Sequence, residues 1–313
     1  MISTTAIKIK SCLFLLVIIT ALLNCSCNRS GVHKAVVVPP LSFKSIKGIA
    51  YTEVHRELKS GLSFDDDGFQ TEPGYQITFV DHDSASVYSP DKKAFINFYV
   101  FIEQDSIFDV ARSYFKMKHM DKDSLILQVL EVKDDTLHTL RSLVYMTFYS
   151  NNYIKAHKLN IEVLGRPTHR DTLFIQHKSA IANKIPDSAF SAHQPVELAS
   201  KSQLLTVTKA NQQSDGFNNI DPADYYMNPT FNITIYKAYE DFSYSFAIFV
   251  DDKGKLIYDH SMIYVMPEFV TSTNKTLKAI TDGYLTAYLK VTPGSTLGIK
   301  HTSYIIVNVV GKK

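Results

Sequence analysis

Tryptophan is absent from this sequence of 313 residues, and its three cysteines all lie within the first 27 positions. A disulfide framework, a cysteine-based zinc site and a cysteine nucleophile are therefore excluded from the rest of the chain. The 33 basic residues nearly balance the 31 acidic ones, so the basic excess that nucleic-acid binding requires is also missing. We find no Gly-x-Ser-x-Gly elbow, no phosphate-binding glycine-rich loop and no dinucleotide-binding fingerprint.

The N-terminus carries the clearest pattern. Lys8 and Lys10 precede an uncharged, mostly apolar run at residues 12–23, and small or polar residues follow it. This order is typical of a secretory signal peptide. The run is too short to span a bilayer, which takes about 20 apolar residues. An uncleaved anchor or a buried helix is the alternative interpretation.

The stretch LLNCSCNRS, residues 22–30, resembles the lipobox of bacterial lipoproteins. In that motif a small residue precedes a cysteine that receives lipid and becomes the mature N-terminus. Ser26 precedes Cys27, whereas Asn24 occupies the same position before Cys25, so we favour Cys27 and keep Cys25 as the alternative. The resemblance implies a signal peptide over residues 1–26, an acylated (palmitate-bearing) N-terminus and a place in the cell envelope of a Gram-negative bacterium.

The segment after the signal peptide predicts a tether. Residues 27–43 contain Gly31 and the pair Pro39-Pro40, which suits a spacer between a membrane and a folded domain. Removal of Lys8 and Lys10 with the signal leaves 31 basic against 31 acidic residues, a neutral mature chain. The acidic run that marks surface export in some lipoprotein families is missing, which by that resemblance favours the periplasmic face of the outer membrane.

Residues 44–160 predict an antiparallel β domain. Short strand-like runs recur with turn residues between them, and along residues 95–102 Ile96, Phe98, Val100 and Ile102 alternate with Phe95, Asn97 and Tyr99. Such a series of hairpins favours a meander that closes into a barrel-like sheet. The hairpin YFKMKHMDKDSLILQVLE, residues 114–131, resembles those of small lipocalin-like domains in bacterial lipoproteins. The Gly-x-Trp of lipocalins is absent, so a ligand-holding calyx is not implied.

Residues 161–219 predict a connector. Phe174, Ile181 and Ile185 are spaced for one face of a helix over residues 171–185, which Pro186 would end. The run 192–215 is polar apart from LLTV at 204–207. We therefore expect proteases to cut first within residues 192–220.

Residues 220–313 predict a smaller domain in which one strand is followed by a hairpin, a helix and a last strand, the last four elements in the order β-β-α-β. Strands are expected at 231–239, 242–250, 255–265 and 301–311, and the turn at 251–254 contains Gly254. An apolar stripe between the third and fourth strands predicts a helix, with Ser272 or Thr273 at its N-cap and Pro293-Gly294 at its end. The fold class expected for the whole chain is α+β.

The run FVDDKGK, residues 249–255, together with this element order resembles the C-terminal domain of TonB-type energy transducers. The resemblance implies the fold of that domain. Energy coupling is not implied, because TonB has a transmembrane helix, a proline-rich spacer and a Tyr-Pro element that this sequence lacks.

Few residues suggest a reactive site. Asp65, Asp66 and Asp67 precede Gly68, but a calcium loop needs alternating ligands and a distal glutamate, so a solvated turn is the better interpretation. Asp81-His82-Asp83 lies where a turn belongs. His157, His169, His177 and His193 match no zinc signature. Aromatic residues gather before the second hairpin, which indicates strand packing or, alternatively, a contact surface; they are Tyr225, Tyr226, Tyr236, Tyr239, Phe242 and Tyr244.

These observations predict no catalytic residue, no cofactor and no metal ligand; Cys27 is the one predicted site residue. The expected function is that of a membrane-anchored envelope binding or interaction module that does not bind nucleic acid. Its expected partner is an envelope protein that adds a strand to the C-terminal domain, at the last strand, residues 303–310, if that strand lies at an edge. The alternative is an envelope hydrolase with its site between the two domains.

Overall fold

The computed structural model describes residues 40–313 except 91, 104–105, 134–135, 139–143 and 211–223. The predicted signal peptide, Cys27 and most of the predicted tether lie outside the described residues. Among the helices that are described, none is both long and apolar enough to cross a membrane.

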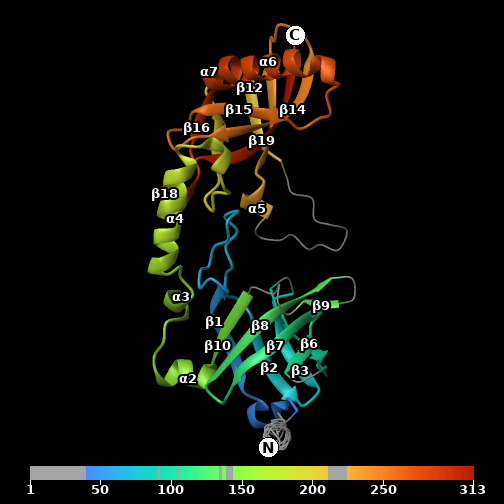
Figure 1. The fold of residues 1–313 in the computed structure, drawn as a ribbon, viewed down its shortest axis with the longest axis vertical. Coiled ribbons are helices and arrows are strands. Elements are labelled where there is room, and N and C mark those ends of the chain that lie inside the picture. Colours follow the sequence, from blue (N-terminus) through green and yellow to red (C-terminus); the bar gives the residue numbers. More distant parts are fainter. Residues whose placement is uncertain (1–39, 91, 104–105, 134–135, 139–143, 211–223) are drawn as a thin grey trace, which may run out of the picture. The chain divides into compact units, whose positions relative to one another are not determined.

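The N-terminal half of the described chain is an antiparallel sheet that nearly closes on itself (Figure 1). The path of paired strands runs β4-β3-β2-β1-β10-β8-β7-β6-β5, and β9 pairs with β8. The two edge strands of this path, β4 and β5, follow each other in the chain, so the two edges of the sheet lie close together. The strands are β1 Ala50–Leu58, β2 Gln76–Asp81, β3 Ser84–Ser89, β4 Ala94–Tyr99, β5 Phe101–Ile102, β6 Ile107–Val110, β7 Ser113–Met120, β8 Ser124–Lys133, β9 Thr136–His138 and β10 Val144–Ser150.

Aromatic and aliphatic side chains fill the interior of this barrel-like sheet. Phe43, from a 3₁₀ turn at Phe43–Ile46, stacks on Phe79 with ring centroids 4.0 Å apart and meets Phe108 edge-on. All three rings are fully buried. The inward positions are thus used for a packed core. The expected antiparallel barrel-like fold is confirmed.

One face assignment within this sheet is wrong. Ile102 is expected on the same strand face as Val100, but Val100 is buried while Ile102 is 38% exposed. The strict alternation breaks where β4 ends and β5 begins, because Phe101 and Ile102 are both exposed.

Three helices follow, α2 Asn151–Ala156, α3 Ile161–Leu164 and α4 His169–Ala182, and then the strands β11 Glu197–Ser200 and β12 Leu205–Lys209. The Thr168 side chain caps α4, and the Asp171 carboxylate accepts from the Thr168 main chain in return, which completes a capping box. Two details of the predicted helix are wrong. It ends at Ala182, and Ile181 and Ile185 are exposed, because the neighbouring side chains pack against its other face, at Ile175 and Ala182.

The C-terminal sheet has the order β12-β13-β19-β14-β15. The β14–β15 hairpin, the helix α6 and β19 beside β14 reproduce the expected β-β-α-β order, and the whole chain is α+β. Leu277 and Ile280 of α6 are buried in the same apolar cluster as Ile305, Val307 and Val309 of β19, and Figure 1 shows α6 lying across the strands. The elements are α5 Asp224–Met227, β13 Thr230–Tyr236, β14 Phe242–Val250, β15 Leu256–Ser261, α6 Val270–Ile280, α7 Thr286–Tyr288, β16 Leu289–Thr292, β17 Ser295–Thr296, β18 Ile299–Lys300 and β19 Ser303–Lys312.

The structure corrects the predicted position of the last strand. β19 pairs in parallel with β13 and antiparallel with β14, so both of its backbone edges are already bonded within the sheet. It is therefore not available for strand addition. Within the described sheet, the edge strands are β12 and β15.

The helix and turn predictions in this half have mixed outcomes. Neither predicted N-cap is used: a 3₁₀ turn at Pro267–Phe269 leads into α6 at Val270. The helical segment ends at Tyr288, before Pro293, because β16 pairs with β11. The predicted turn at 251–254 is confirmed, and Gly254 supplies its positive φ of 84°.

Candidate functional site

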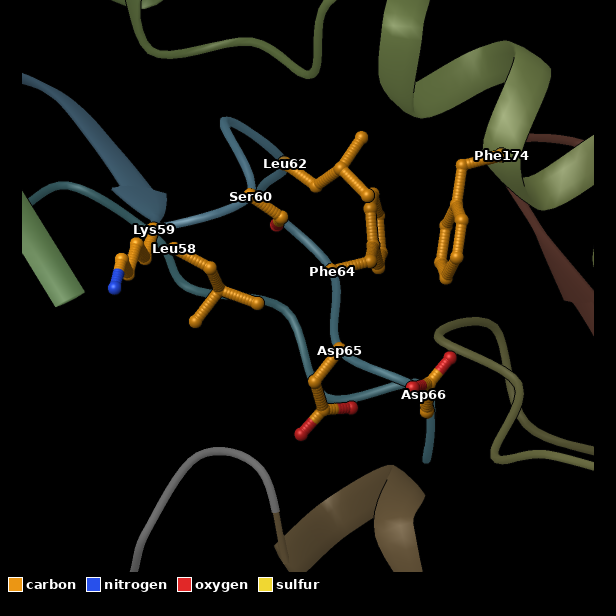
Figure 2. Close-up of a pocket in the computed structure, with 8 residues that line it drawn as sticks. All are labelled: Leu58, Lys59, Ser60, Leu62, Phe64, Asp65, Asp66 and Phe174. Carbon is orange, nitrogen blue, oxygen red and sulfur yellow. The ribbon is translucent and has the colours of Figure 1, made fainter. Parts of the chain in front are cut away.

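A pocket of about 570 Å³ opens between the segment that follows β1 and the helix α4 (Figure 2). Its walls are largely apolar, and charged side chains stand at its rim. In Figure 2, Phe64 and Phe174 lie on one side of the pocket and Lys59 on the other. The lining residues are Leu58, Lys59, Ser60, Leu62, Phe64, Asp65, Asp66 and Phe174.

Asp171 holds the two sides of this pocket together. Its fully buried carboxylate accepts hydrogen bonds from the Ser63 main chain at 2.6 Å and from the Thr168 main chain at 2.6 Å. Arg170 adds a bond to the Ser60 carbonyl at 3.1 Å. These contacts join the α4 N-terminus to the segment after β1. Hydrogen bonds therefore hold the loop that lines the pocket against α4.

Besides the apolar clusters inside the two sheets, a smaller one, the third cluster, lies next to the pocket. It contains Phe64, Ile175, Ala182 and Phe190, and Phe174 packs against it. The pocket therefore offers an apolar surface to a ligand and no array of converging polar groups.

The three aspartates at 65–67 form the expected turn. The Asp65 carboxylate accepts from the Asp67 and Phe69 main chains, both at 2.9 Å, so its own turn uses it. Asp66 faces solvent, with the Lys178 ammonium 3.6 Å away. In the described part of the chain no three His, Cys, Asp or Glu side chains gather where they could hold a metal ion.

His193 is the predicted histidine with the most developed surroundings. Its Nε2 lies 3.1 Å from the Glu72 carboxylate and its Nδ1 lies 3.2 Å from the Gln194 side-chain amide, while the Tyr226 ring meets it edge-on. Both ring nitrogens already face protein groups, so this histidine does not present a base to a substrate. His157 bonds to the Tyr153 carbonyl at the end of α2.

His301 had no signal in the sequence, because its burial depends on Phe190, which lies far from it in the chain. The ring is fully buried and stacks on Phe190 with centroids 3.7 Å apart. Its Nδ1 donates to the Thr302 carbonyl and its Nε2 accepts from the Thr296 hydroxyl, each at 3.0 Å. Burial lowers the pKa of His301 to about 4, so the ring is neutral near pH 7.

The predicted aromatic cluster is divided between core and surface. Tyr226 is buried, and its hydroxyl accepts from the Gln70 main chain at 2.9 Å. Phe242 stacks on Tyr244, and both pack against the C-terminal core. Tyr236 and Tyr239 are exposed. The side chain of Tyr225 lies outside the described residues.

An exposed apolar segment follows the edge strand β15. Residues 262–270 were expected to begin as part of a strand over 255–265, but β15 ends at Ser261. Tyr264 is 86% exposed. Five neighbouring large apolar side chains are also exposed: Met262, Ile263, Met266, Phe269 and Val270.

Comparisons of this chain with models of known protein families, with curated proteins and with solved structures give no match. Its surfaces therefore carry the functional evidence. Among the described residues they include an apolar-walled pocket and an exposed apolar segment beside the edge strand β15, and features of both kinds occur at binding sites.

Proposed function

We propose that this chain is a lipid-anchored protein of the Gram-negative cell envelope, facing the periplasm from the outer membrane, and that it acts as an interaction module. The lipobox-like stretch at residues 22–30 supports the anchor. The nearly closed barrel is compatible with the lipocalin-like lipoprotein resemblance, and the hairpin, helix and returning strand are compatible with the TonB C-terminal resemblance.

The observation that carries the interaction role is the exposed apolar segment 262–270 next to β15. An exposed cluster of Met, Ile, Tyr and Phe side chains is typical of a contact surface. An edge strand offers unpaired main-chain groups to an extended partner segment. The partner of this proposal is an envelope protein that adds a strand at β15 and covers this apolar segment.

The hydrolase alternative lacks a comparable observation. Among the described residues near the predicted connector, a carboxylate and a histidine meet at Glu72–His193, and the second ring nitrogen of His193 lies 3.2 Å from the Gln194 side-chain amide. A hydrolytic base would need that nitrogen to face a hydroxyl or a water.

Cys27→Ala tests the anchor. Without the thiol no acyl chain can be attached, so labelling with radioactive palmitate should disappear and the chain should be found unprocessed or soluble. Cys25→Ala is the matched control and should keep its label. Loss of label in Cys25→Ala alone would move the site to Cys25, label retained in both variants would contradict acylation of one particular cysteine, and an unlabelled wild type would contradict the anchor.

A photoreactive amino acid at position 264, in the full chain in living cells, tests the partner. We expect a discrete cross-linked protein, which Ile263→Asp should abolish by placing a charge in the contact. The same probe at Val163, 54% exposed on α3, is the control and should give no adduct. Adducts of equal yield at both positions, or none at 264, would contradict the proposal.

A further inference from the structure

The outward surface of β3 and β4 has a regular composition. Cross-strand pairing places Ser84 opposite Tyr99, Ser86 opposite Asn97 and Tyr88 opposite Phe95. Ala85 and Val87, which alternate with these residues along β3, are buried on the inner face. We call the six outward residues the β3–β4 platform; it has an aromatic group at each end and a Ser–Asn pair between them.

None of the six platform residues is charged. The outward positions of the adjoining strand β2, Gln76, Thr78 and Val80, are uncharged as well. In the described part of the chain, charged residues lie around the ends of the platform. Asp81, the last residue of β2, pairs with Ser84 and is followed by His82 and Asp83 in the turn, and Lys92-Lys93 lie in the turn at the other end. Asp109 of β6 pairs with Phe101, beyond the platform. An uncharged surface of this kind gives no electrostatic attraction to nucleic acid or to an anionic membrane.

The platform aromatics are open to solvent despite their size. Tyr99 is 74% exposed and Phe95 is 54% exposed. Phe101 extends the surface at one end, 60% exposed and with its ring 6.4 Å from that of Tyr99. Along a strand the four steps from Phe95 to Tyr99 cover about 13 Å, the length of a short run of sugar rings.

We propose that the β3–β4 platform binds a neutral oligosaccharide chain. One face of a pyranose ring carries C–H groups and can lie on an aromatic ring, and its rim carries hydroxyls that both donate and accept. The Ser86 hydroxyl and the Asn97 amide can do the same. The alternation of ring, polar pair and ring on the platform matches this chemistry, and the lack of charge matches an uncharged glycan. This site is independent of the lipid anchor and of the β15 surface.

Affinity electrophoresis tests this site with the full chain in a non-ionic detergent that has no sugar headgroup. Native gels contain dextran, pullulan, mannan or laminarin as neutral probes, or polygalacturonate as the charged one. We expect at least one neutral polysaccharide to retard the protein, and polygalacturonate to retard it less. Tyr99→Ala should weaken that binding at least tenfold, and Phe95→Ala should also weaken it.

Matched variants separate stacking from loss of fold. Tyr99→Phe keeps the ring and should stay within threefold of wild type, and Leu173→Ala, which removes an exposed apolar side chain from α4, should change nothing. Melting temperatures should be unchanged, because these side chains point outward. The proposal is overturned if no neutral probe retards the protein, or if Tyr99→Ala is retarded like wild type. A Tyr99-dependent dimer without retardation would overturn it too, since the surface would then join two copies.

Discussion

Glu53 illustrates how single residues stabilise this protein. Its carboxylate is 1% exposed, yet it has partners on every side: the Arg56 guanidinium binds both oxygens at 2.7 Å, and the Gly74 and Tyr75 main chains each donate at 2.9 Å. A buried charge is tolerated only when it is paired in this way. Through these bonds Glu53 ties β1 to the residues that lead into β2.

Glu53→Ala should lower the free energy of unfolding by about 3–5 kcal/mol, because it leaves the Arg56 charge and two main-chain donors without their partner. Urea denaturation measures the change. Asp282→Ala is the control: it breaks the exposed Lys278–Asp282 pair and should cost less than about 1 kcal/mol. Similar losses in both variants would contradict the role given to Glu53.

His301 should make stability depend on pH. Its pKa is about 4 when folded, against 6.5 for an ordinary histidine, so below pH 6.5 the unfolded chain takes up a proton that the folded protein does not. The contribution of the neutral His301 ring to the free energy of unfolding is fully present above pH 6.5. It should fall by roughly 3 kcal/mol between pH 6.5 and 4.

The difference between wild type and His301→Gln isolates this effect. Carboxylates that titrate in the same pH range change the stability of both proteins equally and cancel in the difference. The Lys178 charge opposes protonation of the His301 ring, so its influence is part of the effect that is measured. The variant should therefore show a shallower loss of stability in thermal melts from pH 7 to pH 4. Parallel curves for the two proteins would rule out His301 as the source.

At the scale of elements, α4 shows how tertiary contacts choose among the faces of a helix. The spacing of Phe174, Ile181 and Ile185 is helical, but Phe64 and Phe190 pack against the face that carries Ile175 instead. The apolar pattern predicts that a helix forms. It does not predict which side the rest of the chain will cover, because several faces of α4 carry apolar side chains.

Ile175→Ala should lower the free energy of unfolding by about 2–5 kcal/mol, since it leaves a cavity in the third cluster. Ile181→Ala, on the same helix but 38% exposed, should cost much less. Chemical denaturation of both variants measures the difference. A larger loss of stability for Ile181→Ala would show that the face carrying Ile181, which the sequence spacing indicated, is the packed one.

Alternation along strands and turn residues such as Gly254 predicted both β regions and the β-β-α-β order. Local patterns carry that information, because each strand shows its own inner face. The missing information concerns partners far along the chain: the place of β19 between β13 and β14, the β11–β16 pair, and the burial of Glu53 and His301. The β3–β4 platform needed the register between two strands, which a single run does not reveal.

At the scale of the whole molecule, residues Leu41–Lys313 form one compact unit, and its described residues include two main sheets and three apolar clusters. The third cluster is small, but its members come from the segment after β1, from α4 and from residues near β18. Parts of the chain that are far apart in sequence are therefore joined by side-chain packing as well as by the backbone.

Limited proteolysis should spare β11 and β12 within the interval 192–220 that was expected to be cut first. β11 pairs with β16 and β12 pairs with β13, and paired backbone must open before a protease can bind it. Residues 211–220, which lie outside the described residues, stay the predicted place of first cleavage. A broad-specificity protease with mass spectrometry locates the cuts. Early cleavage inside β12, or within residues 76–150, would contradict this expectation.

The central place of β19 has a consequence for the order in which the chain folds. β13 and β14 do not pair with each other, because β19 lies between them and follows both in the chain. Until β19 has emerged from the export channel, β12–β13 and β14–β15 are two separate antiparallel pairs, each with an open edge. Open strand edges are prone to incorrect pairing. The strands of the barrel-like sheet all precede β19, so a chaperone that protects this protein as it folds should act on the two strand pairs of its C-terminal half.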